Sequence, residues 1–293
     1  MELPRDEAEQ SLMGDLMALT KARLSMLVVI TTFVGFCMGS EGRIDWLRLV
    51  NAVFGTALAA GAAAVLNQVA EAHVDRLMER TRSRPLPSGR MRRRTALLLG
   101  LGMAFVGVAY LALTVNRISA ILAAATVVIY LLFYTPMKRR TSFCITIGAI
   151  AGAIPPLIGW TAAHPAMTIN AWALFGILFA WQMPHFLAIA WMYRDEYAQA
   201  GFVMLKRDDP SGSSTAGQSL IFTLLLGLIS VVPFAAGLND SMYLGGAMLL
   251  DAALFFFAVQ FLIQRERTSA RSLFFASILY LPLLLGLMVC TKL

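Results

Sequence analysis

The stretch NQVAEAHVDRLMERTRSRPLPSGR, residues 67–90, follows a long apolar run and holds three acids and five arginines. Ionisable side chains at the end of a membrane helix are costly to keep, and those that are kept usually serve a function. The stretch therefore predicts a polar site at one end of a membrane-spanning helix.

The acids of this stretch have a helical spacing. If the preceding helix continues, Asn67, Glu71 and Asp75 stand four residues apart and project from one face. Hard oxygen donors in a row suit Mg²⁺, which prefers carboxylates together with substrate phosphates, and arginine forks match phosphate oxygens. The spacing predicts a joint metal and phosphate site. The competing interpretation is a helix whose acids pair with its own arginines beside an anionic lipid surface. The arginines whose side chains could bind phosphate are Arg76, Arg80, Arg82 and Arg84.

The composition is that of a membrane protein. Hydrophobic residues make up 58% of the 293 residues and charged residues 14%, and the mean hydropathy is +0.70, all far from the averages of soluble domains. We predict an all-α integral membrane fold, with 1–293 as one domain. Runs of about 18 or more mainly apolar residues mark transmembrane helices, and nine occur, near 22–40, 48–70, 95–114, 117–135, 143–162, 169–192, 217–238, 241–263 and 272–290.

The distribution of Lys and Arg predicts the orientation of these helices. With the N-terminus in the cytoplasm, 20 of the 24 basic residues fall in cytoplasmic segments, and only Arg43, Arg48, Arg117 and Lys292 fall outside. The bias follows the positive-inside rule, so residues 1–21 are predicted to be a cytoplasmic tail. Topology thus explains the net charge of +7. No interleaving of basic and aromatic residues indicates nucleic-acid binding.

Two further segments are rich in polar groups. In YTPMKRRTS, residues 134–142, Pro136 is predicted to end the helix. Tyr134 and Lys138 are four residues apart and could converge on one phosphate. The alternative, ordinary positive-inside charge, applies most to Arg139 and Arg140.

The other segment is WQMPHFLAIAWMYRDEYAQAGFVMLKRDDPSG, residues 181–212. Its polar groups begin inside the helix at Gln182 and His185, where Pro184 is predicted to interrupt the helix and to mark a cavity. Hydrogen-bonded core residues are the alternative for this pair. Asp195 and Glu196 follow near the helix end.

Two acidic segments on one side of the membrane suggest two halves of one site. Mg²⁺ ions held between them would neutralise a diphosphate leaving group. The arginines would absorb the charge that develops as an allylic diphosphate ionises. The apolar tail of such a substrate would lie among the helices.

These passages resemble the UbiA-type intramembrane prenyltransferases, whose first motif is NxxxD, then three intervening residues, then a second Asp. Within that family the likeness is greatest to the members that farnesylate protohaem, and it is carried by RTRSRPL at 80–86, YTPMK at 134–138 and WQMPHF at 181–186. The resemblance covers nearly the whole chain. It implies a UbiA-type bundle of nine helices around a central cavity.

The resemblance also implies a role for each matching residue. Asn67, Glu71, Asp75, Asp195 and Glu196 would be catalytic and would bind Mg²⁺. The diphosphate would be held by Arg80, Arg84, Tyr134, Lys138 and Lys206. His185 would lie on the haem side, as an iron ligand or a hydrogen-bonding group, with Gln182 beside it.

Two positions depart from the usual family pattern. Glu71 stands where Asp is more common, so a metal can still be reached but with a different geometry. The second motif reads RDEY, at 194–197, where REDY is the commoner order. Which of Asp195 and Glu196 faces the metal is therefore open.

The implied reaction transfers a farnesyl group from farnesyl diphosphate to a vinyl group of protohaem IX, which converts haem B to haem O. Apolar and aromatic walls would shield the allylic cation, with Phe133, Trp181 and Phe186 as candidates beside ordinary packing. The resemblance implies Mg²⁺ as cofactor, a bacterial inner membrane as location, and haem A synthase or a terminal oxidase assembly as partners.

Two alternatives remain at this point. One is a UbiA-type prenyltransferase acting on an aromatic or quinone precursor. The other is a transporter for an anionic metabolite, since intramembrane acids and broken helices occur there too. Charges gathered at one face, rather than at the membrane midplane, favour the enzyme.

Overall fold

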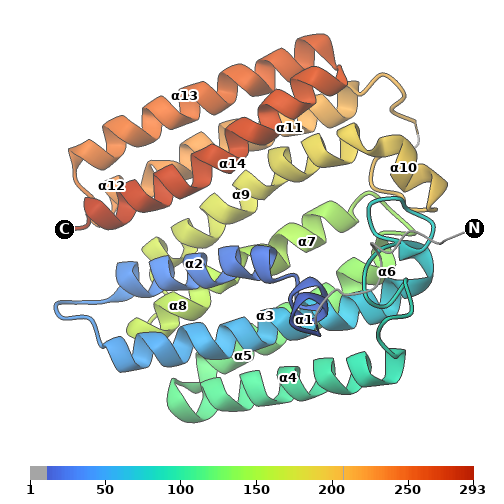
Figure 1. Cartoon of the computed structure of the whole chain (residues 1–293). Coiled ribbons are helices and arrows are strands. Elements are labelled where there is room, and N and C mark those ends of the chain that lie inside the picture. The colour runs from blue at the N-terminus through green and yellow to red at the C-terminus, as the bar shows by residue number, and fades with distance from the viewer. Residues whose placement is uncertain (1–11, 207) are drawn as a thin grey trace, which may run out of the picture.

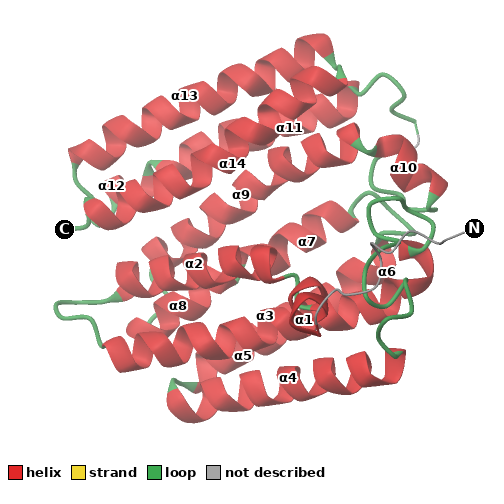
Figure 2. Ribbon diagram, viewed as in Figure 1, coloured by secondary structure: helices red, strands yellow, loops and turns green. Residues whose placement is uncertain are grey.

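The computed structural model describes residues 12–206 and 208–293, and these ranges are helical and contain no β-strand (Figure 2). Residues 1–11, most of the predicted tail, lie outside the described ranges. The helices are α1 (Leu12–Leu19), α2 (Ala22–Gly39), α3 (Trp46–Asp75), α4 (Arg93–Thr114), α5 (Arg117–Val128), the π-helix η2 (Ile129–Tyr134), α6 (Thr135–Met137), α7 (Cys144–Ala153), α8 (Pro155–Ala163), α9 (Ile169–Met192), α10 (Arg194–Gln199), α11 (Ser213–Ser230), α12 (Val232–Ala235), α13 (Ser241–Gln264) and α14 (Arg267–Cys290).

The helices give eight described segments that are long and apolar enough to cross a membrane. A ninth is obtained if α1 and α2, which are bent by 59° to each other, count as one span. Each predicted run lies on one of these segments, so the all-α multi-pass membrane fold is confirmed. The second run was predicted to end near residue 70, but α3 continues to Asp75.

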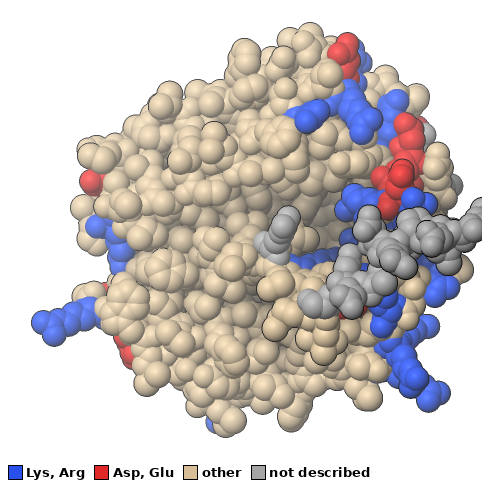
Figure 3. Space-filling view, in the orientation of Figure 1, with Lys and Arg blue, Asp and Glu red and all other residues tan. Residues whose placement is uncertain are grey.

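The spans lie side by side as a bundle whose long loops gather at one end (Figure 1). Residues 76–92, 138–143 and 193–212 all lie at this end, which we call the polar end. Figure 3 shows most of the visible Lys and Arg side chains there, a wide uncharged band, and fewer charges at the opposite end. The predicted charge asymmetry is therefore present, while the side of the membrane that each end faces stays a prediction.

Glycines allow α2 and α8 to pack closely. A Cβ atom at Gly35 would collide with the carbonyl of Pro156, and one at Gly159 would collide with the carbonyl of Thr32. Small residues commonly permit this approach between membrane helices. The crossing fixes α2, whose first residue follows the site lysine described below.

One predicted proline break is present and the other is wrong. The helix that contains Pro136 ends at Met137, one residue after the proline, and Lys138 follows as its C-cap. Helix α9 instead runs without interruption through Pro184. Proline has no N–H and crowds the preceding turn, and here the chain widens into the π-helix η2 immediately before Pro136. The N–H of Thr135 then bonds to the carbonyl of Tyr130, five residues back.

Candidate functional site

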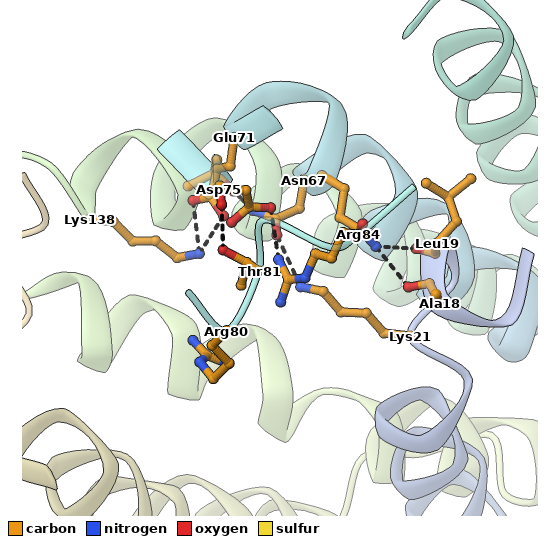
Figure 4. Close-up of polar contacts among 12 residues, drawn as sticks. Ala18, Leu19, Lys21, Asn67, Glu71, Asp75, Arg80, Thr81, Arg84 and Lys138 are labelled. Atoms are coloured by element: carbon orange, nitrogen blue, oxygen red, sulfur yellow. Dashed lines mark hydrogen bonds and ion pairs between the residues drawn. The ribbon is translucent and has the colours of Figure 1, made fainter. Parts of the chain in front are cut away.

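The centre of the polar end is the last part of α3, where the predicted helical continuation is present. Asn67, Glu71 and Asp75 stand on consecutive turns of α3 and are 0%, 7% and 1% exposed. Buried carboxylates of this kind need partners that replace their lost hydration. Each of the two carboxylates has a basic partner brought by another part of the chain (Figure 4).

Lys138 is the partner of Glu71. Its Nζ donates to both carboxylate oxygens, at 2.9 and 3.0 Å. Burial alone lowers the pKa of Lys138, but the neighbouring Tyr134 and Glu71 side chains raise it above its ordinary value. The ammonium therefore stays charged beside the carboxylate.

Arg84 is the partner of Asp75. Its Nη1 donates to Asp75 Oδ2 at 2.8 Å, and the arginine side chain keeps 24% exposure. Thr81 lies between them in sequence, and its hydroxyl donates to the Asp75 carbonyl at 2.8 Å. The loop after α3 thus folds back, so that Arg84 contacts Asp75, the last residue of α3.

The π-helix η2 sets the position of the third passage. Tyr134 ends η2, and its ring lies below the Lys138 ammonium, with Nζ 4.5 Å from the ring centroid. Single π-turns inside helices recur at functional sites because they redirect side chains. The wide turn places Tyr134 and Lys138 together next to Glu71, as the four-residue spacing predicted.

The second acidic segment lies against the first. Glu196 Oε1 accepts a hydrogen bond from the Arg80 backbone N–H at 3.4 Å, and the Arg80 guanidinium donates to the Tyr197 hydroxyl at 3.4 Å. Val74 and Met78 pack in one apolar cluster with residues of this segment, Ala200 and Phe202. The Lys138 carbonyl also accepts from Val203 N–H at 2.6 Å. All three passages singled out in the sequence therefore meet at the polar end.

Two of the predicted site residues lie apart from the α3 acids. The Asp195 side chain is 87% exposed and pairs with Arg194 at 3.7 Å. Lys206 is exposed and lines a separate cavity of about 210 Å³ between α7, α9 and α11. Of the two acids in RDEY, Glu196 is the one directed to the first segment.

His185 and Gln182 also lie apart from the acids, within the bundle. The His185 ring stacks with Trp181 and Phe274, each at a centroid distance of 5.0 Å, and its Nδ1 lies 2.8 Å from Ser277 Oγ. Gln182 donates to the carbonyls of Ala149 and Leu178 and packs on Gly152. The amide links α9 to α7, and His185 links α9 to α14.

Sequence reasoning missed two residues that contact Asn67. Lys21 Nζ donates to Asn67 Oδ1 at 3.1 Å. Asn67 Nδ2 donates to the Thr135 hydroxyl at 3.0 Å, and that hydroxyl donates to the Tyr130 carbonyl. From the sequence, Lys21 was interpreted only as one of the cytoplasmic basic residues that set the orientation. Its position directly before the first apolar run is a signal that would have marked it as a candidate for the polar site.

The donor set of this site fits Mg²⁺ with part of its shell supplied by a substrate. Within residues 12–206 and 208–293, no three His, Cys, Asp or Glu side chains converge as a closed metal cage. Two buried carboxylates and one amide oxygen do stand on consecutive turns of a single helix face. Mg²⁺ is usually bound in this way, by one or two carboxylates plus phosphate oxygens.

The site can therefore do two things at once. Its acids, Glu71 and Asp75, can hold a divalent cation, and their partners Lys138 and Arg84 can turn to the oxygens of a phosphate group. Figure 3 shows the surface hollowed at this end, with Lys and Arg side chains at its floor. The arrangement suits the binding and departure of a diphosphate.

Comparison with known proteins identifies relatives along almost the whole chain. The model of the UbiA prenyltransferase family matches residues 28–279. A protein of Solibacter usitatus named protoheme IX farnesyltransferase is 43% identical over 289 residues, which are 96% of this chain and 99% of that protein. A protein of the same name from Opitutus terrae is 41% identical, over 98% of this chain and 97% of its own.

Solved structures agree on the fold. A structure of digeranylgeranylglyceryl phosphate synthase superposes with a TM-score of 0.81 at 16% identity, over 95% of this chain and 98% of that one. A UbiA homologue from Archaeoglobus fulgidus, bound to GPP and Mg²⁺, superposes with a TM-score of 0.66 at 13% identity, over 94% of this chain and 99% of that one. The family match and the full-length relatives lead to one conclusion: the chain belongs to the UbiA prenyltransferase family.

Proposed function

We propose that this protein transfers the farnesyl group of farnesyl diphosphate to a vinyl group of protohaem IX, converting haem B to haem O. The observation that carries the proposal is the shared name of the full-length relatives, protoheme IX farnesyltransferase, at 43% and 41% identity. The geometry supports it, because buried acids and bases converge at the end of an apolar bundle, as ionisation of a lipid diphosphate requires.

Asn67, Glu71 and Asp75 would hold Mg²⁺, and Glu196 would complete the site from the second segment. Asp195, which is exposed in this structure, would have to turn inward to take part. A bound Mg²⁺ would supply positive charge to the oxygens of the leaving diphosphate. The matching UbiA homologue from Archaeoglobus fulgidus was solved with GPP and Mg²⁺, which supports this cofactor.

The basic residues would bind and orient the diphosphate. Arg84 and Lys138 are already beside the metal-binding acids, and Tyr134 lies under the Lys138 ammonium. Arg80, in the loop after α3, would reach the outer oxygens. Lys206, which lines a separate cavity in this structure, would have to move toward the acids to join it. With these contacts in place, the carbon–oxygen bond breaks and its electron pair leaves with the diphosphate.

The remaining steps take place in the apolar part of the bundle. The vinyl π electrons of the porphyrin form the new bond to the farnesyl C1. Water then adds to the cation that results and loses one proton to the solvent, which leaves a hydroxyl group. Trp181, Phe186 and Phe274 lie next to His185 between α9 and α14, and they would keep water away until the vinyl group has reacted. His185 would contact the haem, with Gln182 holding α7 and α9 together.

Location and partners follow from the same proposal. The polar end would face the cytoplasm of a bacterial inner membrane, following the positive-inside rule. The product would pass to haem A synthase or to a terminal oxidase assembly.

The test is incubation of the purified protein in detergent with protohaem, farnesyl diphosphate and Mg²⁺, followed by mass analysis of the extracted haem. We expect a haem heavier by one farnesyl group and one water. Unmodified haem, together with prenylation of an aromatic or quinone precursor offered instead, would contradict the proposal and assign the chain to another branch of the family.

A further inference from the structure

Lys21 lies in the turn between α1 and α2, and its side chain reaches across to α3. Its Nζ is 3.1 Å from Asn67 Oδ1. Figure 4 shows the Lys21 and Arg84 side chains converging on the Asn67–Asp75 face of α3. The residue therefore belongs to the site in space, although 46 residues separate it from Asn67 in the sequence.

The backbone at Lys21 is held in an unusual conformation. It is left-handed, with φ 48° and ψ 50°, a conformation that is unfavourable for a residue with a side chain. Among the described residues only Arg265 shares such a φ without being glycine. Strain of this kind persists where the surroundings determine it, and it is frequent at functional sites.

Contacts made by α1 fix the position of the turn that contains Lys21. Gln68, the residue after Asn67, donates through Nε2 to the carbonyls of Ala18 and Leu19, at 3.0 and 2.7 Å. Asp15 on α1 pairs with Arg90 at 3.0 Å. Helix α1 is thus attached to α3 and to the loop that follows it, and this attachment delivers Lys21 to Asn67.

The charges around Lys21 are unequal. Lys138 pairs with Glu71, and Arg84 pairs with Asp75. Within the described residues, Lys21 is within ion-pair distance of no carboxylate and contacts the neutral amide of Asn67. Among the described residues, three cations therefore face two anions, and a partly buried ammonium without a counter-ion is unfavourable. The cluster as it stands has room for one more anion.

We infer that Lys21 is a diphosphate ligand, the third cation of the site beside Arg84 and Lys138. The inference rests on the proposed function, which supplies the diphosphate. The amide of Asn67 is oriented by Thr135, so its oxygen points to Lys21 in the absence of substrate. When Asn67 Oδ1 turns to a metal, the Lys21 ammonium is released to a phosphate oxygen a short distance away.

The experiment measures binding of inorganic diphosphate to the detergent-purified full-length protein in the presence of Mg²⁺, by titration calorimetry. We expect Lys21→Met to raise the dissociation constant about ten- to a hundred-fold, as for the loss of one charged hydrogen bond. Lys21→Gln keeps a hydrogen-bond donor for Asn67 but has no charge, and its dissociation constant for diphosphate should rise by the same factor. Lys21→Arg should retain most of the affinity.

Lys292→Met is the matched control. This lysine also donates to neutral oxygens, the carbonyls of Cys37 and Ser40, but it lies at the opposite end of the bundle. Its removal should leave the dissociation constant unchanged. Thermal unfolding of each variant separates a binding defect from loss of the fold, and Lys21→Gln serves where Lys21→Met does not fold.

Diphosphate affinity of Lys21→Gln equal to that of the unmodified protein would overturn the inference. The acceptor plays no part in this measurement. Lys21-dependent diphosphate binding without conversion of haem would therefore leave the inference standing and remove only the proposed acceptor.

Discussion

The Lys138 ammonium lies 2.9 and 3.0 Å from the two carboxylate oxygens of Glu71. The residue proposed to bind phosphate is therefore paired, in this structure, with the residue proposed to bind the metal. Arg84 and Asp75 repeat the relationship at 2.8 Å. A cation that approaches Glu71 alone must displace the Lys138 ammonium, for which Glu71 is the ion-pair partner among the described residues. When Mg²⁺ and diphosphate arrive together, both ion pairs are exchanged for new ones.

We therefore predict that Mg²⁺ and diphosphate bind cooperatively. The dissociation constant for Mg²⁺ should fall at least about five-fold when inorganic diphosphate is present, and the constant for diphosphate should fall by the same factor when Mg²⁺ is present. Titration calorimetry of each ligand with and without the other gives both factors. Independent binding would mean that the two ion pairs are not exchanged. Turnover that is unchanged in EDTA would remove the metal role altogether.

Asp75→Asn should lower turnover by about a hundred-fold or more, because the carboxylate is removed from the place where leaving-group charge is neutralised. The protein should remain folded in the membrane fraction, since asparagine is nearly isosteric. Asp240→Asn is the matched control. Asp240 caps α13, and asparagine caps helices equally well. Full activity of Asp75→Asn would exclude this acid from the metal site.

His185→Ala should impair haem retention or product formation more than His164→Ala does. His185 lies between the aromatic rings of α9 and α14, whereas His164 lies 3.3 Å from Glu41 at the opposite end. The measurement is the haem absorbance of the purified protein after removal of excess haem, together with product yield. Equal effects of the two substitutions would leave His185 as a packing residue.

Tyr280→Phe should destabilise the protein without affecting diphosphate binding. The Tyr280 hydroxyl donates to Asp251 Oδ1 at 2.6 Å, and Ser230 donates to Oδ2 at 2.6 Å, which joins α11, α13 and α14. Loss of one such bond costs about 1–2 kcal/mol, or a few degrees in Tm. Thermal unfolding in detergent measures the change in stability, and diphosphate titration measures the change in diphosphate affinity. A change in diphosphate affinity would show that this distant cluster acts on the site.

The sequence predicted the parts of the site that lie within one helix or one turn. The spacing of Asn67, Glu71 and Asp75 required only that a helix continue, and hydropathy located every span. The pairing of Tyr134 with Lys138 was predicted from a separation of four residues. These are local relationships, and helical periodicity is enough to fix them.

The relationships that were missed cross the chain or depend on packing. Lys21 reaches Asn67 through a bend between α1 and α2, and no periodicity reports such a bend. The helix ends just after Pro136, as predicted, but no sequence pattern indicated that the chain widens into the π-helix η2 before it. The exposure of Asp195 and the inward direction of Glu196 depend on the phase of a six-residue helix, α10, that the sequence leaves undetermined.

The attachment of α1 to α3 matters for anyone who shortens or tags this protein. Hydropathy alone marks residues before Ala22 as dispensable, because every apolar run would survive their removal. A protein trimmed there would lack the Lys21 ammonium beside Asn67 and the helix α1, whose last residues Gln68 binds. Expression level and monodispersity would then be misleading guides to an intact enzyme.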